Sequence, residues 1–419
     1  MARIAIIGAG FVGLSSAYWL RRDGHQVTLF DPRGAAGGAS FGNAGTFATY
    51  ACIPVNNPGV FRDFHRYLFS AESPFRLRAG YLPRALPWLL RFLVSSTPRR
   101  YEQSAEALAS LLGRAYEGYE DLIQEAGLER FLSRRDALTL YSSKRGYEAA
   151  QPALDLRRKF GIVAEVLEPS GIRDLEPELA PLFHRGVRFP GTWHLKSPAG
   201  FLEALEAWLI AGGMESEREA VERLEPRGDE VRLVTTRGSC SFDHAVVAAG
   251  ALSGKFAQQC GDRVPLDTER GYHVGFPGGE SLLSRPVGWA ERGFYMTPMG
   301  EALRAAGTVE LAGLGPRQHR ALLQLLRSSS QRALPALPPA GESWLGFRPT
   351  LPDGLPVIGS SSASQRVLYA FGHQHIGLTL GGLTGRLVAD IVSDRPPLLD
   401  LTACSPRRFK GARPGSWRV

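Results

Sequence analysis

The N-terminal part of the chain alternates short apolar runs with breaks of glycine and charge. Arg3–Ile7 consists mostly of β-branched and small apolar residues, which is typical of a buried strand. Leu14–Arg22 predicts a helix that ends before Gly24, and Gln26–Phe30 predicts a second strand that closes on Asp31. Together these elements span about 30 residues, the length of a crossover unit between two parallel strands.

Helical and strand patterns continue to alternate along the chain, and no internal repeat is visible. The helical segments are Tyr101–Gly127, Gly146–Phe160, Pro198–Ile210, Gln318–Leu334 and Leu378–Val392. The strand segments are Ala137–Tyr141, Val163–Leu167, Val231–Thr236, His244–Ala248, Gly271–Phe276, Gly293–Thr297 and Ala302–Leu311. At 419 residues the chain exceeds the roughly 250–300 residues of one hydrophobic core, so the pattern predicts an α/β protein with two domains.

The composition is that of an ordinary globular protein, with 44% hydrophobic and 21% charged residues. Lys and Arg number 49 against 41 Asp and Glu, and much of the excess lies in Phe61–Arg100 and Pro406–Val419. A basic surface suits nucleic acid, anionic lipid or acidic substrates, but no nucleic-acid-binding module is visible, so we expect no nucleic-acid partner. The aromatic and basic segment Phe61–Arg100 predicts either peripheral contact with an anionic membrane or a solvated helix face with a core-facing stripe.

Cysteine usage and hydropathy indicate the compartment. Cys52, Cys240, Cys260 and Cys404 lie far apart without a CxxC pair, which indicates neither a disulfide framework nor a zinc site. A reducing, cytoplasmic location is the simplest prediction. The uncharged run that starts at Ile4 is interrupted by three glycines and is better explained below than as an export signal. No later stretch approaches the roughly 20 apolar residues of a membrane-spanning helix.

The interrupting glycines form the pattern Gly8-x-Gly10-x-x-Gly13 between a predicted strand and a predicted helix. In this context Gly8 permits a tight turn, Gly10 admits a pyrophosphate to the backbone, and Gly13 lets helix and strand pack closely. The free N–H groups of the helix N-terminus then bind the pyrophosphate. Asp31, 18 residues after Gly13, is placed to accept a hydrogen bond from a ribose hydroxyl. The sequence therefore predicts a dinucleotide site.

The glycine fingerprint alone does not distinguish NAD from FAD. Arg33 closely follows Asp31 and either pairs with adenosine or pyrophosphate oxygens or remains a solvated surface residue. The segment 37–45 is rich in glycine and small residues, which leaves its backbone N–H groups accessible. Such a loop suits the close approach of a long, flat cofactor.

Five segments resemble those of a known protein family. They are Ile4–Leu14, Ala39–Gly45, His244–Gly250, Gly346–Gly359 and Phe371–Leu380. Together they resemble the flavoprotein D-amino acid oxidase/dehydrogenase superfamily, which includes bacterial D-amino acid dehydrogenases, glycine oxidase and sarcosine oxidase. The resemblance extends over nearly the whole chain and implies FAD as the cofactor. It also implies a Rossmann-like FAD-binding domain and a second, discontinuous substrate domain built on a mostly antiparallel sheet. The expected boundaries are 1–95, 155–255 and 342–400 for the FAD-binding domain, 96–154 and 256–341 for the substrate-binding domain, and 401–419 for a basic C-terminal tail.

The last of these segments leads into the predicted helix that starts near Leu378. A helix N-terminus presents unpaired N–H groups and a positive dipole, which stabilise the negative charge of a reduced flavin. The alternative is a glycine-rich helix that is simply packed closely in the core. The resemblance and these arguments together give the following expected cofactor contacts: Gly8, Gly10, Phe11, Val12, Gly13, Asp31, Pro32, Arg33, Ala39, Ser40, Asn43, Ala44, Gly45, Val221, Ala248, Ala249, Gly250, Arg348, Gly372, His373, Gln374, Ile376, Gly377, Leu378 and Thr379.

His373 and His375 share one face if their segment is a strand, as metal ligands often do. No third and fourth ligand with suitable spacing accompany them, so we predict no metal site. One of the two is expected near the flavin or substrate and the other in a structural role. The sequence does not say which is which.

Oxidation of an amino acid requires that its carboxylate be oriented. A guanidinium is the natural clamp, because its fork matches two carboxylate oxygens. Arg348 stands where the resemblance places a carboxylate-binding arginine, the alternative being a cofactor-supporting or structural role. Tyr272, His273 and Tyr295 lie on predicted strands that resemble the substrate-facing sheet. Their side chains either bind the substrate or belong to an amphipathic core.

Within the superfamily the chain is most similar to bacterial D-amino acid dehydrogenases, including those of cyclic D-imino acids such as D-proline and cis-4-hydroxy-D-proline. This implies hydride transfer from Cα to flavin N5, with electrons passed to a quinone or another respiratory carrier. The alternatives are an oxygen-using amine oxidase of the glycine or sarcosine oxidase kind and a subunit of an opine-type oxidase complex. A non-catalytic flavin-binding partner and an NAD-dependent dehydrogenase are more distant alternatives.

Overall fold

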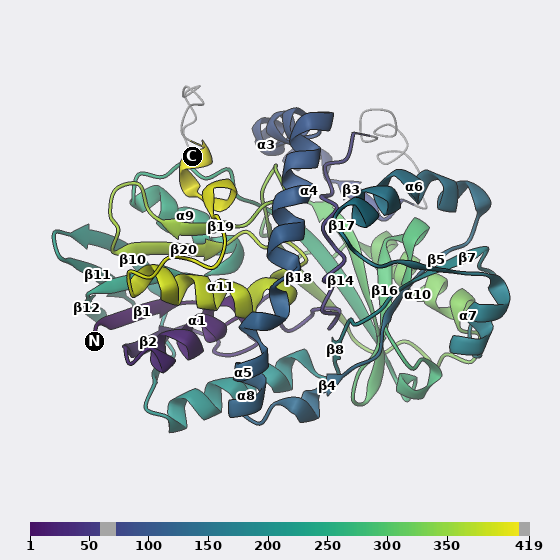
Figure 1. The fold of residues 1–419 in the computed structure, drawn as a ribbon, viewed down its shortest axis with the longest axis horizontal. Helices are drawn as coiled ribbons and strands as arrows, with labels where there is room; N and C mark the ends of the chain where they lie inside the picture. Colours follow the sequence, from purple (N-terminus) through teal and green to yellow (C-terminus); the bar gives the residue numbers. More distant parts are fainter. Residues whose placement is uncertain (59–72, 410–419) are drawn as a thin grey trace.

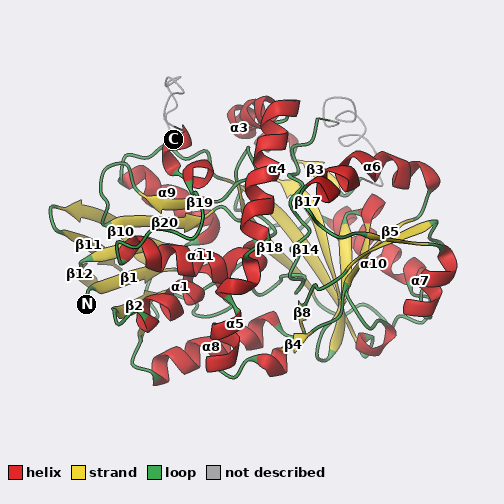
Figure 2. Cartoon of the chain, in the orientation of Figure 1, coloured by secondary structure: helices red, strands yellow, loops and turns green. Residues whose placement is uncertain are grey.

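The computed structural model describes residues 1–58 and 73–409 of the chain. Two large sheets lie side by side, each covered by helices (Figures 1 and 2). In Figure 1 the smaller sheet lies on the left, with the N-terminus, and the larger sheet lies on the right. The long helix α4 (Pro98–Leu112) passes between them in this view.

The smaller sheet has six strands in the order β19-β20-β13-β1-β2-β9. Their bounds are β1 (Arg3–Ile7), β2 (Gln26–Phe30), β9 (Glu215–Glu217), β13 (His244–Val247), β19 (Val357–Ser360) and β20 (Val367–Phe371). All neighbouring strands are parallel except β19 and β20. The crossover from β1 to β2 runs through α1 (Phe11–Arg22), as the N-terminal pattern predicts.

Both faces of β1 are buried. Ile4 and Ile6 belong to a core formed with α1 and α11 (Gly377–Val392). Ala5 and Ile7 pack instead with a three-stranded antiparallel sheet, which consists of β10 (Val221–Arg227), β11 (Glu230–Thr235) and β12 (Gly238–Phe242). A strand buried on both faces reads as a continuous apolar run, which is why the local pattern identified it.

The larger sheet has nine strands, eight of them in the order β18-β14-β17-β16-β15-β5-β7-β6, with β3 beside the end of β17. Their bounds are β3 (Phe75–Leu77), β5 (Ala137–Tyr141), β6 (Glu165–Leu167), β7 (Arg185–Phe189), β14 (Asp267–Pro277), β15 (Val287–Trp289), β16 (Phe294–Pro298), β17 (Ala302–Leu311) and β18 (Ser343–Thr350). Pairing is antiparallel except between β5 and β15 and between β3 and β17. Helix α10 (Arg320–Ala333) covers one face, where Leu322 and Leu326 pack with Val274 and Phe276 of β14.

The remaining helices lie around these sheets. They are α3 (Leu82–Ser95), α5 (Glu120–Glu125), α6 (Lys144–Lys159), α7 (Pro169–Leu175), α8 (Pro198–Ala211) and α9 (Ser253–Gln259), and a small sheet pairs β4 (Leu132–Ser133) with β8 (His194–Leu195). Within the described residues, no helix combines the length and the apolarity needed to cross a membrane.

The predicted helix Tyr101–Gly127 is wrong as a single element. Helix α4 ends at Leu112, and α5 starts at Glu120 after a short 3-10 turn, η2 (Ala115–Gly118). The break serves tertiary packing, because a Cβ at Gly118 would lie 2.1 Å from the carbonyl carbon of Gly382 in α11. The helix is interrupted where its backbone contacts α11, and the local sequence pattern does not indicate this contact.

Strand pairing also divides the chain differently from the predicted domain boundaries. Strands β6 and β7 lie in residues 155–255, and β18 lies in residues 342–400. Both ranges were expected to belong to the FAD-binding domain, yet all three strands pair within the larger sheet. Residues 401–409 do not form a free tail, because Cys404 is buried and Arg408 forms an ion pair with Asp353 at 2.8 Å. Pairing partners far apart in sequence leave no local signal. Residues 410–419 of the expected tail, and 59–72 of the basic aromatic segment, lie outside the described residues.

Candidate active site

Two glycines hold the start of α1 against the ends of neighbouring strands. Gly8 has a φ of +113°, and a Cβ there would lie 2.4 Å from the carbonyl oxygen of Ala248. A Cβ at Gly13 would lie 1.8 Å from the Gly8 oxygen, so α1 packs directly on the turn after β1. The turn 8–13 therefore lies beside the segment 248–250 that follows β13. Both are predicted cofactor-binding segments.

Helix α11 brings the C-terminal block to the same place. A Cβ at Gly381 would lie 3.1 Å from the Phe11 Cβ, and one at Gly385 would lie 2.5 Å from the Ser15 carbonyl carbon. Only glycine permits two helices to approach this closely. The start of α1 and the first turns of α11 thus lie side by side, although most of the chain separates them in sequence (Figure 1).

The glycine-rich loop 37–45 approaches the N-terminus of α1. A Cβ at Gly10 would lie 2.9 Å from the Ser40 Oγ, which also accepts a hydrogen bond from the Phe11 N–H at 3.4 Å. Gly10 caps α1 without any side-chain hydrogen bond. Apart from this long contact between the Phe11 N–H and Ser40, no side-chain hydrogen bond to the first N–H groups of α1 is found among the described residues, which leaves this helix terminus suited to an anion.

Arg304 of β17 ties this loop to the larger sheet. Its guanidinium donates to the carbonyls of Phe41 and Asn43 at 3.0 and 2.9 Å, and desolvation lowers its pKa to about 10. The Asn43 side chain in turn accepts a hydrogen bond from the Gly45 N–H at 2.7 Å. No sequence motif singles out Arg304, because its partners are backbone carbonyls some 260 residues earlier in the chain.

Asp31, at the end of β2, lies beside the glycine turn. Its two carboxylate oxygens accept hydrogen bonds from the N–H groups of Ala9 and Arg33 at 3.0 and 2.9 Å. Each carboxylate oxygen has a further lone pair, so the carboxylate retains capacity for a ribose hydroxyl. The side chains of Pro32 and Arg33 are exposed.

The arginine that lies over the next turn is Arg218, which the sequence patterns missed. A Cβ at Gly34 would lie 2.0 Å from the Arg218 Nη1. Arg218 forms an ion pair with the buried carboxylate of Glu206 at 2.8 Å, which raises the pKa of Arg218 and fixes its fork. Glu206 also accepts from the Ala35 N–H at 3.2 Å, so the pair is anchored to this turn.

The start of α11 is held by contacts with distant segments. Thr379 Oγ1 accepts a hydrogen bond from the Ala48 N–H at 2.9 Å, and the Gln374 N–H donates to the Pro349 carbonyl at 2.9 Å. Gln374 adopts a left-handed conformation with φ +50° at the turn into the helix. The helix itself has no side-chain cap at Ile376. Its N-terminus therefore offers the positive end of its dipole beside the glycine turn.

The structure distinguishes the two histidines that the sequence left open. His373 is buried with its Nε2 at 2.9 Å from the Thr384 hydroxyl, and desolvation lowers its pKa to about 3. His375 is exposed, yet desolvation and the nearby Arg348 charge lower its pKa to about 4. Of the two, His373 packs in the core, and we propose His375, which is close enough to Arg348 to be influenced by its charge, as the histidine of the substrate site.

These segments fit an FAD molecule. They combine a glycine cradle that any Cβ would fill, two helix N-termini without side-chain caps, and a carboxylate beside them. One buried hydroxyl there, that of Thr46, has no hydrogen-bond partner among the described residues. Val221 lies at the start of β10 in the core, where its carbonyl accepts a hydrogen bond from Lys255 at 3.2 Å. The other expected contacts occupy the same segments: Val12, Ala39, Ala44, Ala249, Gly250, Gly372, Gly377 and Leu378.

One face of the larger sheet points toward these segments. The register pairs Glu269 with Arg348 and His273 with Trp344, and alternation puts all four side chains on one face. His273 stacks on Trp344 with ring centroids 5.2 Å apart, and its Nδ1 lies 3.3 Å from the Gly42 carbonyl. Desolvation lowers the pKa of His273 to about 4, so the ring is neutral near pH 7. His273 and Arg348 therefore lie on one surface, next to the glycine-rich loop.

Arg348 is held by carbonyls from an irregular part of β17. Its Nη1 donates to the Thr308 carbonyl at 2.8 Å and its Nη2 to the Gly307 carbonyl at 3.4 Å. Thr308 has φ +58°, which a β-branched residue adopts only under strain, and it sits where the β14–β17 register shifts. Strain of this kind persists when the surroundings enforce it, and here it turns two carbonyls onto one guanidinium.

Glu269 lies beside Arg348 and is a carboxylate that the sequence did not mark. Its side chain is buried, and Thr350 Oγ1 donates to it at 3.1 Å. Burial raises the pKa of Glu269, while the Arg348 charge opposes that rise. Burial likewise lowers the pKa of Arg348, opposed by Glu269. The two charges therefore partly compensate each other inside the protein.

Tyr295 lies on the same face, in a row of hydroxyl groups. Its Oη accepts a hydrogen bond from the Tyr50 hydroxyl at 3.0 Å and lies 3.0 Å from the Thr139 Oγ1. Tyr50 is buried and stacks on Phe189 with ring centroids 3.9 Å apart. Tyr50, which follows the glycine-rich loop, escaped the sequence analysis because nothing local indicates that it meets β16.

The prediction that Tyr272 faces the substrate is wrong. Its neighbours on alternate positions of β14, Val274 and Phe276, belong with it to the core under α10. Its hydroxyl donates to the buried carboxylate of Glu310 and accepts from the His319 N–H at 3.1 Å. Side chains alternate across a strand, so Tyr272 lies on the opposite face from His273. The sequence showed the alternation but not which of its two faces meets the cofactor.

We expect Tyr272→Phe to lower the free energy of unfolding by about 1–3 kcal/mol, because the buried Glu310 carboxylate loses a hydrogen-bond donor. The KM for substrate should stay unchanged. Chemical denaturation and steady-state kinetics measure the two quantities. Tyr295→Phe is the comparison on the other face: it also removes a hydrogen-bond partner from a buried group, the Tyr50 hydroxyl, but unlike Tyr272→Phe it should change KM. An altered KM and unaltered stability in Tyr272→Phe would place its hydroxyl on the substrate face after all.

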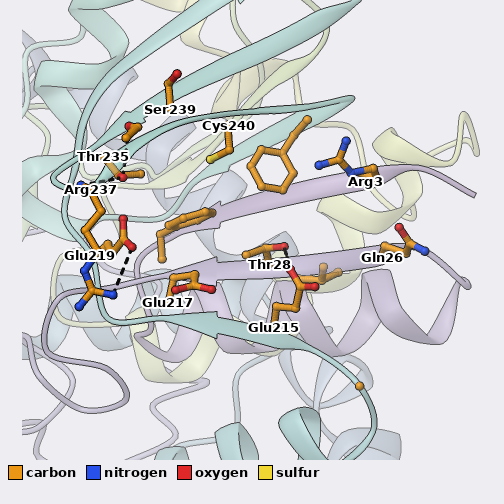
Figure 3. Close-up of a pocket in the computed structure, with 15 residues that line it drawn as sticks. Arg3, Gln26, Thr28, Glu215, Glu217, Glu219, Thr235, Arg237, Ser239 and Cys240 are labelled. Atoms are coloured by element: carbon orange, nitrogen blue, oxygen red, sulfur yellow. Dashed lines mark hydrogen bonds and ion pairs between the residues drawn. The ribbon is translucent and has the colours of Figure 1, made fainter.

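A cavity of about 520 Å³ lies elsewhere, along β2, β9 and β12 (Figure 3). Its labelled lining residues include Arg3, Thr28, Glu215 and Arg237, and it is open and polar. It includes none of the predicted cofactor or substrate residues. The predicted site residues lie in the converging segments described above and not in this cavity.

The fold and the site together define a flavoprotein oxidoreductase, with a dinucleotide cradle that faces an arginine-bearing sheet. The family model described as DAO, FAD dependent oxidoreductase, matches residues 3–391, and the chain belongs to this family. FAD is its cofactor, and the α/β fold with a Rossmann-like cofactor domain is confirmed.

Relatives and solved structures agree with this assignment. The chain is 38% identical over 416 residues to a D-amino-acid oxidase of Bradyrhizobium diazoefficiens, covering 97% of this chain and 98% of that protein. It is 30% identical over 431 residues to a D-amino acid dehydrogenase of a Methylobacterium species, covering 98% and 100%. Glycine oxidase from Geobacillus kaustophilus superposes with a TM-score of 0.76 at 22% identity, covering 98% of this chain and 100% of that chain. L-proline dehydrogenase from P. horikoshii gives 0.74 at 17% identity, covering 97% of each. These two likenesses show the fold.

Proposed function

We propose that the chain oxidises a D-amino acid or a cyclic D-imino acid, such as D-proline or cis-4-hydroxy-D-proline. FAD, when bound, would supply the two-electron acceptor, at N5, for a hydride from the substrate Cα, and a quinone or another respiratory carrier would then take up the electrons. Relatives named as D-amino acid oxidase and D-amino acid dehydrogenase, similar over almost their entire length, support the substrate class.

The observation that carries this proposal is the guanidinium of Arg348. Two carbonyls hold it, and a guanidinium has five N–H donors, so several donors remain free among the described residues. A fixed fork with free donors binds both oxygens of a substrate carboxylate. Held in that way, the substrate loses rotational freedom before reaction, which contributes several kcal/mol to the lowering of the barrier.

The other side chains of this face orient the rest of the substrate. We propose that Tyr295, held by Tyr50 and Thr139, hydrogen-bonds the amino or imino group. His273 remains neutral near pH 7 and stacks on Trp344. It therefore forms one wall of the substrate site without adding a positive charge to that of Arg348. Glu269 offsets the Arg348 charge before the substrate carboxylate arrives. We therefore propose Arg348, Tyr295 and His273 as substrate contacts and Glu269 as a positioning residue.

The enzyme is expected to show strict use of D enantiomers. Under anaerobic conditions, the flavin absorbance of the purified protein should bleach with D-proline, cis-4-hydroxy-D-proline or another D-amino acid, and not with the L enantiomers. D-lactate, which keeps the carboxylate but lacks nitrogen, is a matched control and should leave the flavin oxidised. Absence of bleaching with every enantiomer tried would reject the proposal and favour a non-catalytic flavin protein.

An oxygen-using amine oxidase is the second candidate, favoured by the name of the 38% identical relative. Turnover with an artificial dye and with dissolved oxygen separates the two. For a dehydrogenase we expect the dye reaction to be faster by at least about tenfold, a barrier difference of about 1.4 kcal/mol. Peroxide production at a comparable rate would establish the oxidase instead. Activity that appears only with a second protein would favour a subunit of an oxidase complex.

A quinone acceptor lies in a membrane, so we propose a cytoplasmic protein that contacts the inner face of the cytoplasmic membrane peripherally. The absence of a membrane-crossing helix in the described residues leaves surface contact as the way to reach such an acceptor.

A further inference from the structure

Helix α3 (Leu82–Ser95) carries apolar residues on its outward face. Leu82, Leu86, Leu90 and Val94 follow one another at intervals of four and are 42%, 50%, 56% and 50% exposed. Residues four apart lie on one side of a helix, so these four form a continuous ridge about 18 Å long. Surface helices of soluble domains usually carry polar residues in this position. We call these four side chains the α3 ridge.

The other side of α3 faces the protein. Ala85, Trp88 and Ser95 are buried, and Trp88 stacks on Phe92 with ring centroids 5.2 Å apart. The helix is therefore already anchored to the fold when it presents the ridge. In Figure 1 it lies at the upper edge of the molecule, with little of the fold beyond it. The exposed fractions of its four side chains make the ridge accessible to a partner.

The charge around α3 indicates what the partner is. Between Ser73 and Tyr101 the chain contains six arginines and no acidic residue. Arg84 and Arg91 lie on α3, and Arg99 and Arg100 start α4; all four are exposed. An apolar ridge with arginines along its flank is the signature of a helix that lies in the interface of an anionic membrane. With 14 residues, α3 is too short to cross the roughly 30 Å hydrocarbon core.

We propose that the α3 ridge docks this protein on the surface of an anionic phospholipid membrane. The leucines insert between the acyl chains, and Arg84 and Arg91 pair with lipid phosphates. A second copy of the chain is the less suitable occupant, because four side chains fall well short of the roughly 20–30 residues per partner of a stable interface, and facing arginines would repel. The inference extends the proposed function by naming the surface and the lipid, but it does not depend on the substrate.

The test is co-sedimentation of the full-length protein with vesicles. Wild-type protein should bind vesicles of phosphatidylcholine with phosphatidylglycerol and bind pure phosphatidylcholine much less. The double variant Leu86→Ser, Leu90→Ser should lose binding by at least about tenfold, since two inserted side chains are removed. Arg84→Gln and Arg91→Gln should each weaken binding to anionic vesicles by about fivefold, with little effect on neutral ones. Raising the salt concentration should reproduce the arginine effect.

Val163→Ser with Ile210→Ser is the matched control, because these side chains are 62% and 44% exposed away from α3, in the loop before β6 and on α8. This variant should bind vesicles like the wild type. All variants should keep dye-linked turnover in solution, so failure of the docking proposal is distinguishable from failure of the proposed function. Equal vesicle binding by wild type and the leucine variant would overturn the proposal. A wild-type dimer that the leucine variant dissociates, without vesicle binding, would also overturn it in favour of a second copy.

Discussion

Replacing Arg348 with methionine should leave FAD bound but reduce kcat/KM for a D-amino acid by roughly 30-fold to several thousand-fold. This range corresponds to the about 2–5 kcal/mol lost when one partner of a buried charge pair is removed. Methionine approximates the length of the side chain and keeps its apolar stem, so the loss reflects the guanidinium. Most of the effect should fall on apparent substrate affinity, because the carboxylate contact exists before the reaction.

The controls for this variant distinguish a loss of carboxylate binding from a loss of folded protein. Arg173→Met, at an exposed position on α7, makes the same chemical change away from the site and should leave the kinetics unaltered. The flavin content of Arg348→Met should equal that of the wild type. An amine substrate without a carboxylate should react equally poorly with both proteins. Unchanged kcat/KM with the D-amino acid would remove Arg348 from the substrate site.

Gly10→Val should yield a folded protein without flavin. A Cβ at Gly10 would lie 2.9 Å from the Ser40 Oγ, a flexible contact that can yield, so the fold should tolerate the added atoms. The valine methyls would however occupy the space over the N-terminus of α1, where the pyrophosphate must approach the backbone. Losing one or two charged hydrogen bonds of about 1.5–3 kcal/mol each predicts a fall in FAD affinity of roughly 10-fold or far more. Flavin absorbance per mole of purified protein measures it.

Two other glycines serve as comparisons. A Cβ at Gly80 meets nothing within 4 Å, so Gly80→Val should keep its flavin. A Cβ at Gly13 would meet the Gly8 oxygen at 1.8 Å, so Gly13→Ala should unfold at markedly lower denaturant concentration. Circular dichroism confirms that Gly10→Val is folded. A yellow Gly10→Val protein with normal FAD affinity would mean that the cofactor does not approach the backbone here.

The elements that the sequence predicted well are those whose signals are local. Arg3–Ile7, Gln26–Phe30 and Ala302–Leu311 have the predicted bounds as β1, β2 and β17. Their periodicity reflects burial by layers on one or both faces, which every residue of the strand experiences directly. The strands β10, β12 and β18 were missed, because polar or glycine-rich sequence weakens that periodicity. Strand β20 was missed although all five of its residues are buried and none is charged.

The candidate site was predicted in part for the same reason. Gly8 and Gly13 are predictable from the motif, because their backbone conformation and close packing require glycine at those positions. Arg304 and Tyr50 act through carbonyls and hydroxyls brought from distant segments, and no motif records such contacts. Tyr272 shows the limit most directly, since a two-residue period reveals two faces but not what covers each.

By itself, the sequence determined a strand–turn–helix–strand unit with a dinucleotide cradle, and the motifs that identify a flavoprotein. These features depend on a few neighbouring residues whose backbone conformation and burial follow from their own side chains. Only the tertiary structure decided that Arg348 and Tyr295 share a face while Tyr272 lies behind it, and that α3 turns leucines to the outside. Those outcomes depend on strand register and on packing between segments hundreds of residues apart, where the chain carries no local signal.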